Sequence, residues 1–384
     1  MDPMNTASMI ARLQSSGIRL NDPRAGAASR RGGAGPSDHK AVTIDGVTVM
    51  VPVHTAGAFD SPFEAGVPDA DGQATLSCDG KALGVIRFPS QPRFYGLKTA
   101  EGVPYSQIAT LHGRDVLATT VLQTCIRYQS RTRTCQFCAI GQSLAAGRTI
   151  ARKTPAQLAE VAKAAVALDG VKHMVMTTGT PATPDRGASV LVESARAIRA
   201  AVNLPLQAQC EPPDHDGWFA TMREAGIDTL GMHLEAVTPE VRARIMPGKA
   251  SVPLSRYMES FRAAVPVFGR GQVSTYILAG LGDSREALLA MAQDLIAIGV
   301  YPFIVPFVPI TGTPLESHPA PSPEFMASVL GPLADMLAAG GLAAEKVKAG
   351  CARCGACSAL STFEKLRQSS GQVASGQMAA GQVA

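Results

Sequence analysis

The sequence predicts an α/β fold built on a parallel sheet, either open or curled into a barrel. The main observation is an alternation after residue 118 between short apolar segments and longer segments of helical periodicity. The expected strands cover residues 119–124, 174–178, 205–209, 229–234, 272–279 and 301–308. A second observation is the composition, 46% hydrophobic and 17% charged, which is typical of a globular chain with a sizeable core.

The helices between these strands have readable beginnings and ends. In Thr154-Pro155-Ala156-Gln157 the threonine is a candidate N-cap, the proline suits the first helical position, and the glutamine completes a capping box. Gly170 and Gly299 follow helical patterns and can adopt the left-handed conformation that ends a helix. The clearest helices are expected over residues 154–168, 283–298 and 322–337.

The rest of the chain divides around this repeat by composition. The first forty residues are rich in Ala, Gly, Ser and Arg without an apolar period, which predicts a flexible arm. Short β-branched segments follow, at 42–53 and 83–88, as in a small β-rich unit. The expected order is the arm (1–40), the β-rich unit (41–118), the βα repeat (119–320), a C-terminal helix with three cysteines (321–368) and a disordered tail (369–384).

Charge and hydropathy exclude several classes of partner. The net charge of +4 is small and evenly spread, so it indicates neither nucleic-acid nor membrane-surface binding. The sequence has no run of about 18 apolar residues, and its N-terminus lacks the apolar core of a signal peptide. We therefore expect a soluble cytoplasmic protein.

Six of the eight cysteines form two triplets. Close cysteine spacing in a chain without a secretory signal indicates metal binding or catalysis rather than disulfides. The first triplet is Cys125, Cys135 and Cys138, and the second triplet is Cys351, Cys354 and Cys357.

The first triplet begins where the first expected strand ends, the edge at which parallel α/β proteins place their active sites. Three thiolates can hold three irons of a [4Fe–4S] cluster and leave the fourth iron open, whereas electron-transfer clusters normally have four cysteines. An open iron implies a bound substrate or cofactor. A zinc site completed by His112 or His173 is the alternative, since zinc also takes three Cys and one His.

The first triplet resembles the motif of the radical S-adenosylmethionine (SAM) superfamily. That motif usually has three residues and then two between its cysteines, with an aromatic residue before the last one. Phe137 fills the aromatic position, whereas the first gap is nine residues here. The resemblance covers about residues 120 to 320 and extends to the ends of the later strands.

Four segments at these strand ends resemble SAM contacts of the superfamily. Thr178-Gly179-Thr180 takes the place of the Gly-Gly-Glu that meets the SAM amino group, although the glutamate is missing. His233-Leu234-Glu235 resembles the Asn-Leu-Glu of lipoyl synthase and its relatives, which implies that His233 and Glu235 contact the ribose or the carboxylate. The segment around Gly280 resembles the adenine-facing strand, and Gly312-Thr313-Pro314-Leu315 is typical of the biotin synthase group.

The resemblance implies a partial (β/α)6 barrel of the TIM type and a radical SAM enzyme. The implied cofactors are SAM and a [4Fe–4S] cluster on the first triplet, where an electron cleaves SAM to a 5′-deoxyadenosyl radical that abstracts hydrogen from a small-molecule substrate. The implied electron donor is external, such as a flavodoxin or ferredoxin. The closest fit is an uncharacterised bacterial radical SAM family found beside nitrilase-type genes, which implies a role in nitrogen or nitrile metabolism. Glu211, after the third expected strand, is a further pocket candidate.

The second triplet has two-residue gaps twice over, as at the beginning of the bacterial ferredoxin motif. It predicts a second iron–sulfur cluster on Cys351, Cys354 and Cys357, with Cys210 or Cys78 as the candidate fourth ligand and zinc as the main rival. Two other functions stay open. A sulfur-inserting enzyme like biotin or lipoyl synthase would consume the second cluster, and a non-enzymatic electron-transfer or metal-binding protein would need no SAM.

Overall fold

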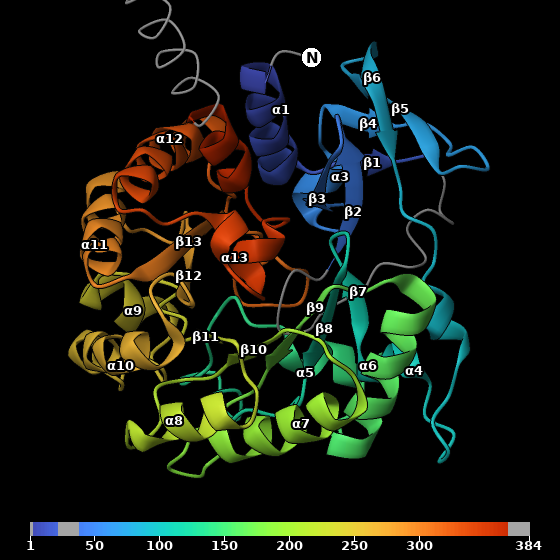
Figure 1. Ribbon diagram of the computed structural model, residues 1–384. Coiled ribbons are helices and arrows are strands. Elements are labelled where there is room, and N and C mark those ends of the chain that lie inside the picture. Colours follow the sequence, from blue (N-terminus) through green and yellow to red (C-terminus); the bar gives the residue numbers. More distant parts are fainter. Residues whose placement is uncertain (1–2, 22–37, 368–384) are drawn as a thin grey trace, which may run out of the picture.

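The larger of two sheets forms a partial barrel. The computed structural model describes residues 3–21 and 38–367, and within them this sheet has seven strands in the order β13-β12-β11-β10-β9-β8-β7 (Figure 1). The strands are β7 (Thr110–His112), β8 (Val116–Thr120), β9 (His173–Thr177), β10 (Leu206–Gln209), β11 (Thr229–Gly231), β12 (Val273–Ala279) and β13 (Val300–Pro306). Strands β8 to β13 are parallel and follow sequence order, which confirms the predicted fold class; β7 adds an antiparallel edge strand.

Two of the expected strands differ from the observed ones in an informative way. The strand expected at 119–124 is β8, which begins three residues earlier, so the boundary expected at residue 118 falls inside the barrel sheet. The strand expected at 229–234 ends at Gly231. Beyond it, Glu235 makes an isolated parallel bridge to Ile277 with a φ of +56°. Alternation along a regular strand therefore does not determine the direction of the Glu235 side chain.

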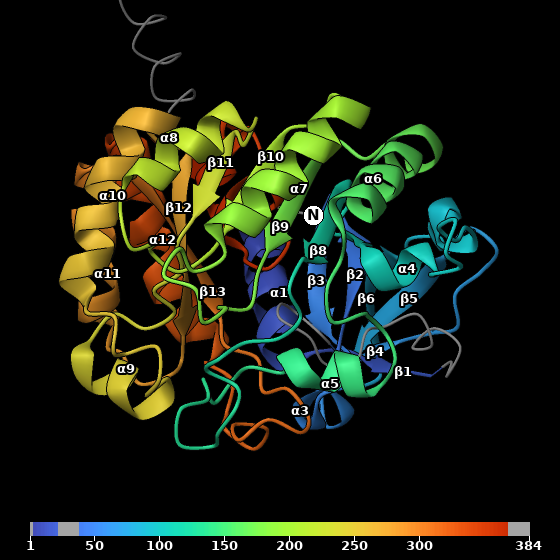
Figure 2. The same cartoon turned by 90° about the horizontal axis from the view of Figure 1, so that it is seen from below.

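Helices connect the parallel strands and form the outer layer of the barrel (Figure 2). They are α5 (Ile140–Ala145), α6 (Pro155–Asp169), α7 (Ala188–Ala201), α8 (Gly217–Glu224), α9 (Pro239–Ile245), α10 (Leu254–Phe268), α11 (Arg285–Ala297) and α12 (Pro323–Ala339). At the start of α6, the backbone N–H of Gln157 donates to Thr154 Oγ1, and the Thr154 N–H donates to Gln157 Oε1. The predicted capping box is thereby confirmed.

The smaller sheet lies beside the barrel and has the strand order β1-β4-β5-β6-β2-β3. Its strands are β1 (Arg19–Leu20), β2 (His39–Ile44), β3 (Val47–Pro52), β4 (Phe63–Ala65), β5 (Gln73–Cys78) and β6 (Lys81–Arg87). The short helix α3 (Ala56–Phe59) follows β3, whereas η1 (Arg93–Gly96) and α4 (Tyr105–Ile108) pack against α6 of the barrel. The hydrophobic core is continuous between this sheet and the barrel, since buried side chains of both belong to one cluster.

The flexible arm expected over residues 1–40 is wrong for its first half. Residues Pro3–Ser16 form helix α1, which packs against β3 and α12. Ile10 and Leu13 are completely buried there, so the helix is held by apolar contacts with distant parts of the chain. Residues 22–37 of the expected arm, and the expected tail (369–384), lie outside the described residues.

The C-terminal segment returns to the barrel at the N-terminal ends of its strands. After η2 (Ala344–Lys346) it forms α13 (Cys351–Cys354), which lies near the centre of Figure 1. The N–H of Gly350 donates to His173 Nδ1 at the start of β9. The carbonyl of Ala356 accepts hydrogen bonds from Met50 N in β3 and from Gln14 Nε2 in α1. The smaller sheet and α1 thus hold this segment in place.

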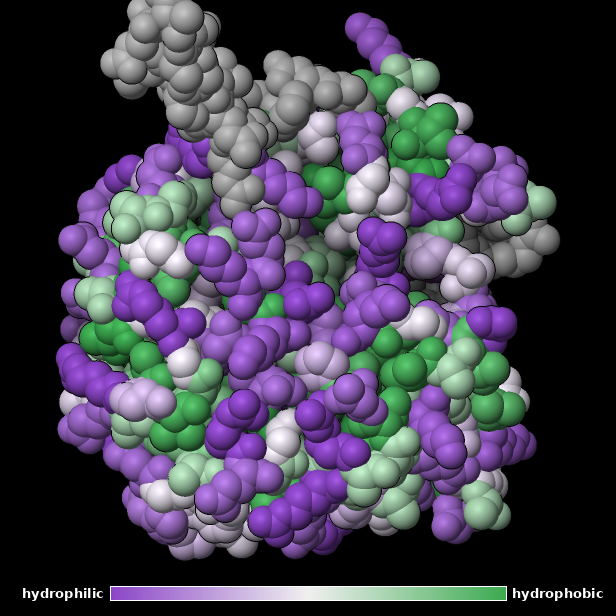
Figure 3. All heavy atoms as spheres, in the orientation of Figure 1, coloured by the Kyte–Doolittle hydropathy of each residue, from purple (hydrophilic) through white to green (hydrophobic). Residues whose placement is uncertain are grey.

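The outer face seen in Figure 3 is mostly hydrophilic, with apolar side chains in small separate groups. Among the described residues, no helix combines the length and the apolar character needed to cross a bilayer.

Candidate active site

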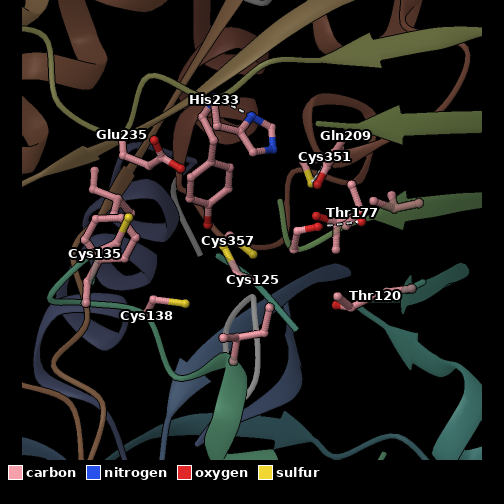
Figure 4. Close-up of a pocket in the computed structure, with 18 of the residues that line it drawn as sticks. Thr120, Cys125, Cys135, Cys138, Thr177, Gln209, His233, Glu235, Cys351 and Cys357 are labelled. Atoms are coloured by element: carbon pink, nitrogen blue, oxygen red, sulfur yellow. Dashed lines mark hydrogen bonds between the residues drawn. The ribbon is translucent and has the colours of Figure 1, made fainter. Parts of the chain in front are cut away.

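A cavity of about 330 Å³ occupies the interior of the barrel. Its wall includes alternate residues of neighbouring strands, such as Val116, Ala118 and Thr120 of β8, and Val175 and Thr177 of β9. Larger side chains fill the interior of a TIM barrel, whereas these are small and leave space. Figure 4 shows side chains of both cysteine triplets pointing into this cavity.

The first triplet lies in the loop between β8 and α5, at the carboxyl end of the strands. The loop is held by backbone hydrogen bonds, among them Cys138 N to Cys135 O at 2.9 Å and Gln136 N to Ile245 O at 2.8 Å. Burial raises the pKa of the Cys138 thiol to about 12 and raises the pKa of Cys135 well above its usual value. Without a metal these thiols are therefore neutral, and ligation would release their protons.

The segment after β9 approaches this loop very closely. Thr178, Gly179 and Thr180 all line the cavity, and the Gly179 N–H donates to Leu122 O at 2.8 Å. A Cβ atom on Gly179 would lie 2.2 Å from the Thr124 carbonyl oxygen, so only glycine fits this position. The close approach places the Gly179 backbone directly against the loop that carries the first triplet.

A buried ion pair joins the cysteine loop to the end of β10. Arg127 donates from Nη2 to Glu211 Oε2 at 2.9 Å and from Nε to Glu211 Oε1 at 3.3 Å, and Thr180 Oγ1 donates to Oε1 at 2.8 Å. Burial alone would raise the pKa of Glu211, but the Arg127 hydrogen bonds and the nearby positive charges keep it below its usual value. The sequence predicted Glu211 as a pocket residue. The structure places it on the cavity wall, where it pairs with Arg127.

A second buried ion pair involves Glu235. Lys249 Nζ lies 2.7 and 2.6 Å from its two carboxylate oxygens, and both residues line the cavity. Burial opposes the charge of Lys249, but the carboxylate of Glu235 more than compensates and raises the lysine pKa. The polar partner required by an inward Glu235 is thus Lys249 in this structure.

His233 and Gly280 occupy different surroundings. His233 lines the cavity, and its Nδ1 accepts a hydrogen bond from Tyr276 N at 3.1 Å. Burial and the charge of Lys249 lower the His233 pKa to about 3, so the ring is neutral. Gly280 instead lies against Pro321, where a Cβ would be 2.9 Å from the proline ring, and it is not among the residues that line the described cavity.

The second triplet lies on α13 and the turn after it, and all three of its cysteines line the cavity. Gln209 Nε2 donates to Cys351 Sγ at 3.2 Å, and His112 Nε2 lies 3.3 Å from Cys357 Sγ. Burial raises the pKa values of all three thiols, that of Cys354 to about 12. The two triplets, more than 200 residues apart in sequence, therefore face one cavity.

The remaining candidate ligands fall in separate places. His112 is beside the second triplet rather than the first, and the His173 Nδ1 atom already accepts from Gly350. Cys78 lies on β5, with its sulfur 4.0 Å from Arg12 Nη2. Cys210 lines the cavity, and its raised pKa of about 12 reflects burial first and then Glu211 and Asp185.

Sequence reasoning missed Arg127, Lys249 and Tyr276 as cavity residues. Arg127 stands inside the cysteine loop, and its place two residues after Cys125 was a usable signal. Lys249 belongs to the connection between α9 and α10, where no motif marks it. Tyr276 begins the segment that resembles the adenine-facing strand, but only Gly280 was singled out there.

Comparison with known families shows what the barrel part of the chain is similar to. Residues 132–295 match the family described as the radical SAM superfamily. This part of the chain is thus similar to the radical SAM superfamily. The similarity supports SAM-dependent radical chemistry at a [4Fe–4S] cluster in general terms, and it does not favour the non-enzymatic alternative.

Individual relatives are distant. Bacteriochlorophyllide c C-7(1)-hydroxylase of Chlorobaculum limnaeum is 28% identical over 53% of this chain and 55% of its own length. Lipoyl synthase of Bacillus velezensis is 30% identical over 44% of this chain and 54% of its own length. The chain thus spans about half the length of these radical SAM relatives. The crystal structure of methylornithine synthase aligns with a TM-score of 0.46 and 17% identity, over 64% of this chain and 71% of that one.

The donor atoms of this chain suit the cofactors of the radical SAM superfamily. The first triplet offers three thiols at the carboxyl end of the strands, and the close backbone approach at Gly179 leaves the cavity open beside them. Three sulfur ligands match three irons of a cubane cluster and leave one iron for SAM. The residues present therefore fit both groups.

Proposed function

We propose that the first triplet holds the [4Fe–4S] cluster at which SAM is reductively cleaved. The observation that carries this proposal is the set of Cys125, Cys135 and Cys138 on one loop, at the strand ends and on the wall of the barrel cavity. When bound, the cluster and SAM supply reductive cleavage to a 5′-deoxyadenosyl radical, which abstracts hydrogen from the substrate. The role of the chain is to ligate, to orient and to exclude water.

Residues around the cavity divide this work. The backbone at Thr178, Gly179 and Thr180 is proposed to meet the amino group of SAM, because the fixed position of Gly179 keeps side chains away from the cluster. Glu235 is proposed to orient SAM while Lys249 balances its charge. His233 is proposed to contribute a neutral Nε2 on the same wall, since its Nδ1 is bonded to Tyr276 N.

We propose that Gly280 lies near the adenine and acts there only through its backbone. Its carbonyl oxygen lies 2.9 Å from His318 Nε2, and its φ of +105° requires glycine. Its position against Pro321, outside the cavity wall, supports a role in shaping the end of β12 rather than direct contact.

The substrate is proposed to be a small molecule of nitrogen or nitrile metabolism. The buried carboxylates of Glu211 and Glu235 could accept hydrogen bonds from nitrogen-bound protons. Electrons are proposed to come from a flavodoxin or ferredoxin, and the eight free thiols suit a reducing compartment such as the cytoplasm.

Anaerobic reconstitution followed by iron and sulfide counting tests the proposal. We expect about eight irons per chain in the intact protein and about four in the variant in which the first triplet is replaced by alanines. SAM should change the electron paramagnetic resonance (EPR) spectrum of the reduced intact protein and leave that of the variant unchanged. An identical response to SAM in both proteins would contradict the assignment of the first triplet.

A further inference from the structure

The second triplet has a nitrogen donor beside it that its sequence motif does not contain. We propose that His112 is the fourth ligand of a second iron–sulfur cluster held by Cys351, Cys354 and Cys357. This inference extends the proposed function, because it adds a closed Cys3His centre to the same cavity. Ligation uses the lone pair of the neutral imidazole and the three thiolates, whose protons pass to solvent.

The C-terminal segment presents its thiols on a fixed piece of backbone. Cys354 N donates to Gly350 O at 2.9 Å, and Gly355 N donates to Cys351 O at 2.9 Å. A Cβ on Gly350 would lie 2.1 Å from the amide carbon of Gln207, so the segment is pressed directly onto β10. The backbone that carries the three cysteines is thus held in place by the fold, although among the described residues no three metal-ligating side chains are already gathered as a metal site.

The hairpin between β7 and β8 brings the fourth donor to the same place. His112 is the last residue of β7, and its Nε2 lies 3.3 Å from Cys357 Sγ. In the turn that follows, a Cβ on Gly113 would lie 3.0 Å from Cys354 Sγ. The hairpin therefore contacts two of the three cysteines. Because each ligand of a cubane binds a different iron, the imidazole and Cys357 would separate when the cluster forms.

The other groups near the second triplet are less suitable ligands. Gln209 presents the N–H of its amide to Cys351, which stabilises a thiolate but cannot bind iron. Tyr276 approaches Cys357 with its hydroxyl, which is placed to hydrogen-bond with the thiol. Cys78 lies on β5 of the smaller sheet, where its sulfur faces Arg12 Nη2 of α1 at 4.0 Å. Among these groups, only His112 offers an imidazole nitrogen, a known ligand of iron–sulfur clusters, next to the sulfurs.

This ligand set gives the two clusters different chemistry. A cluster with four protein ligands has no open iron, so SAM binding falls to the first triplet, where an iron remains open. Histidine in place of cysteine also removes one negative charge and raises the reduction potential, as in Rieske centres. The second centre is then suited to pass electrons rather than to bind the substrate through iron.

The test isolates the second centre in full-length protein. The variant Cys125→Ala/Cys135→Ala/Cys138→Ala is reconstituted with iron and sulfide, reduced, and studied by pulsed EPR for coupling to nitrogen. We expect the coupling of a directly bound ¹⁴N, replaced by the ¹⁵N pattern when the protein contains ¹⁵N-histidine. Adding His112→Ala should abolish this coupling and make one of the four irons labile, so that mild oxidation produces the [3Fe–4S] signal.

Two further variants keep the result interpretable. His112→Cys should restore a stable four-iron cluster without nitrogen coupling and with a more negative potential. His39→Asn, which alters another imidazole on the cavity wall, should leave the coupling unchanged. The proposal is overturned if nitrogen coupling is absent with His112 in place, if it survives His112→Ala, or if the triplet takes up zinc instead of iron. Since the first triplet is absent throughout, these outcomes do not depend on SAM cleavage.

Discussion

The buried pair of Lys249 and Glu235 provides a quantitative test of how the cavity is stabilised. Lys249 Nζ lies 2.7 and 2.6 Å from the two carboxylate oxygens, and the two side chains are only 10% and 14% exposed. Lys249→Met leaves a carboxylate buried without its cation. Loss of one member of a buried pair typically costs about 3–5 kcal/mol, and we expect the free energy of unfolding to fall by about that amount.

The double variant Lys249→Met/Glu235→Gln removes both charges and should be more stable than Lys249→Met alone by about 2 kcal/mol or more. The intact protein, Lys249→Met, Glu235→Gln and the double variant are unfolded in urea without metal and followed by circular dichroism. Their four free energies of unfolding complete the double-mutant cycle. A matched control is Arg256 with Asp216, a pair at 2.8 Å whose side chains are 27% and 42% exposed. Its coupling should be about 0–1 kcal/mol. Strict additivity at Lys249 and Glu235 would refute the reasoning.

The same variants separate stability from cofactor binding. Glu235→Gln keeps the shape of the side chain but loses a charge-assisted hydrogen bond, which is worth about 1.5–3 kcal/mol. We expect the dissociation constant for SAM to rise by about ten- to a hundredfold. Lower stability with unchanged SAM affinity would assign Glu235 to the ion pair alone.

Three further predictions follow from the same geometry. Cys138→Ala should abolish SAM cleavage and Cys354→Ala should preserve the first cluster; loss of the same metal signal in both variants would contradict two separate centres. Because His233 has a pKa of about 3 when folded and about 6.5 when unfolded, the unfolded state binds its proton first as the pH falls. Below pH 6.5, protonation of His233 in the unfolded state should lower the free energy of unfolding by up to about 1.4 kcal/mol per pH unit. The same dependence of the free energy on pH in His233→Asn would contradict this prediction. Gly179→Ala should displace the cysteine loop and so lower the iron content of the protein. The control Gly57→Ala, whose Cβ would contact nothing within 4 Å, should keep the full iron content. Equal iron contents in the two variants would contradict the prediction.

Local signals in the sequence predicted much of the barrel. The capping box at Thr154 and the alternation of apolar strands with helices depend on neighbouring residues, and both are present in the structure. Helix α1 was missed because the composition of the first forty residues as a whole hid its short apolar stripe, and because its stability depends on packing against β3 and α12, far along the chain.

The site was predictable only where a motif carried it. The two triplets stand out by spacing, but their meeting at one cavity depends on the return of the C-terminal segment to the barrel. Glu235 was found through its motif, whereas its partner Lys249 lies in a connection without any pattern. Its left-handed backbone could not be foreseen either, because φ values above zero are uncommon outside glycine.

Formation of 5′-deoxyadenosine tests the central claim most directly. Reconstituted protein is incubated without oxygen with SAM and dithionite, and the products are quantified by chromatography and mass spectrometry. The intact protein should form 5′-deoxyadenosine and methionine in equal amounts, whereas the variant without the first triplet should form neither. Absence of cleavage by protein that carries its full complement of iron and sulfide, under this strong reductant, would contradict the account.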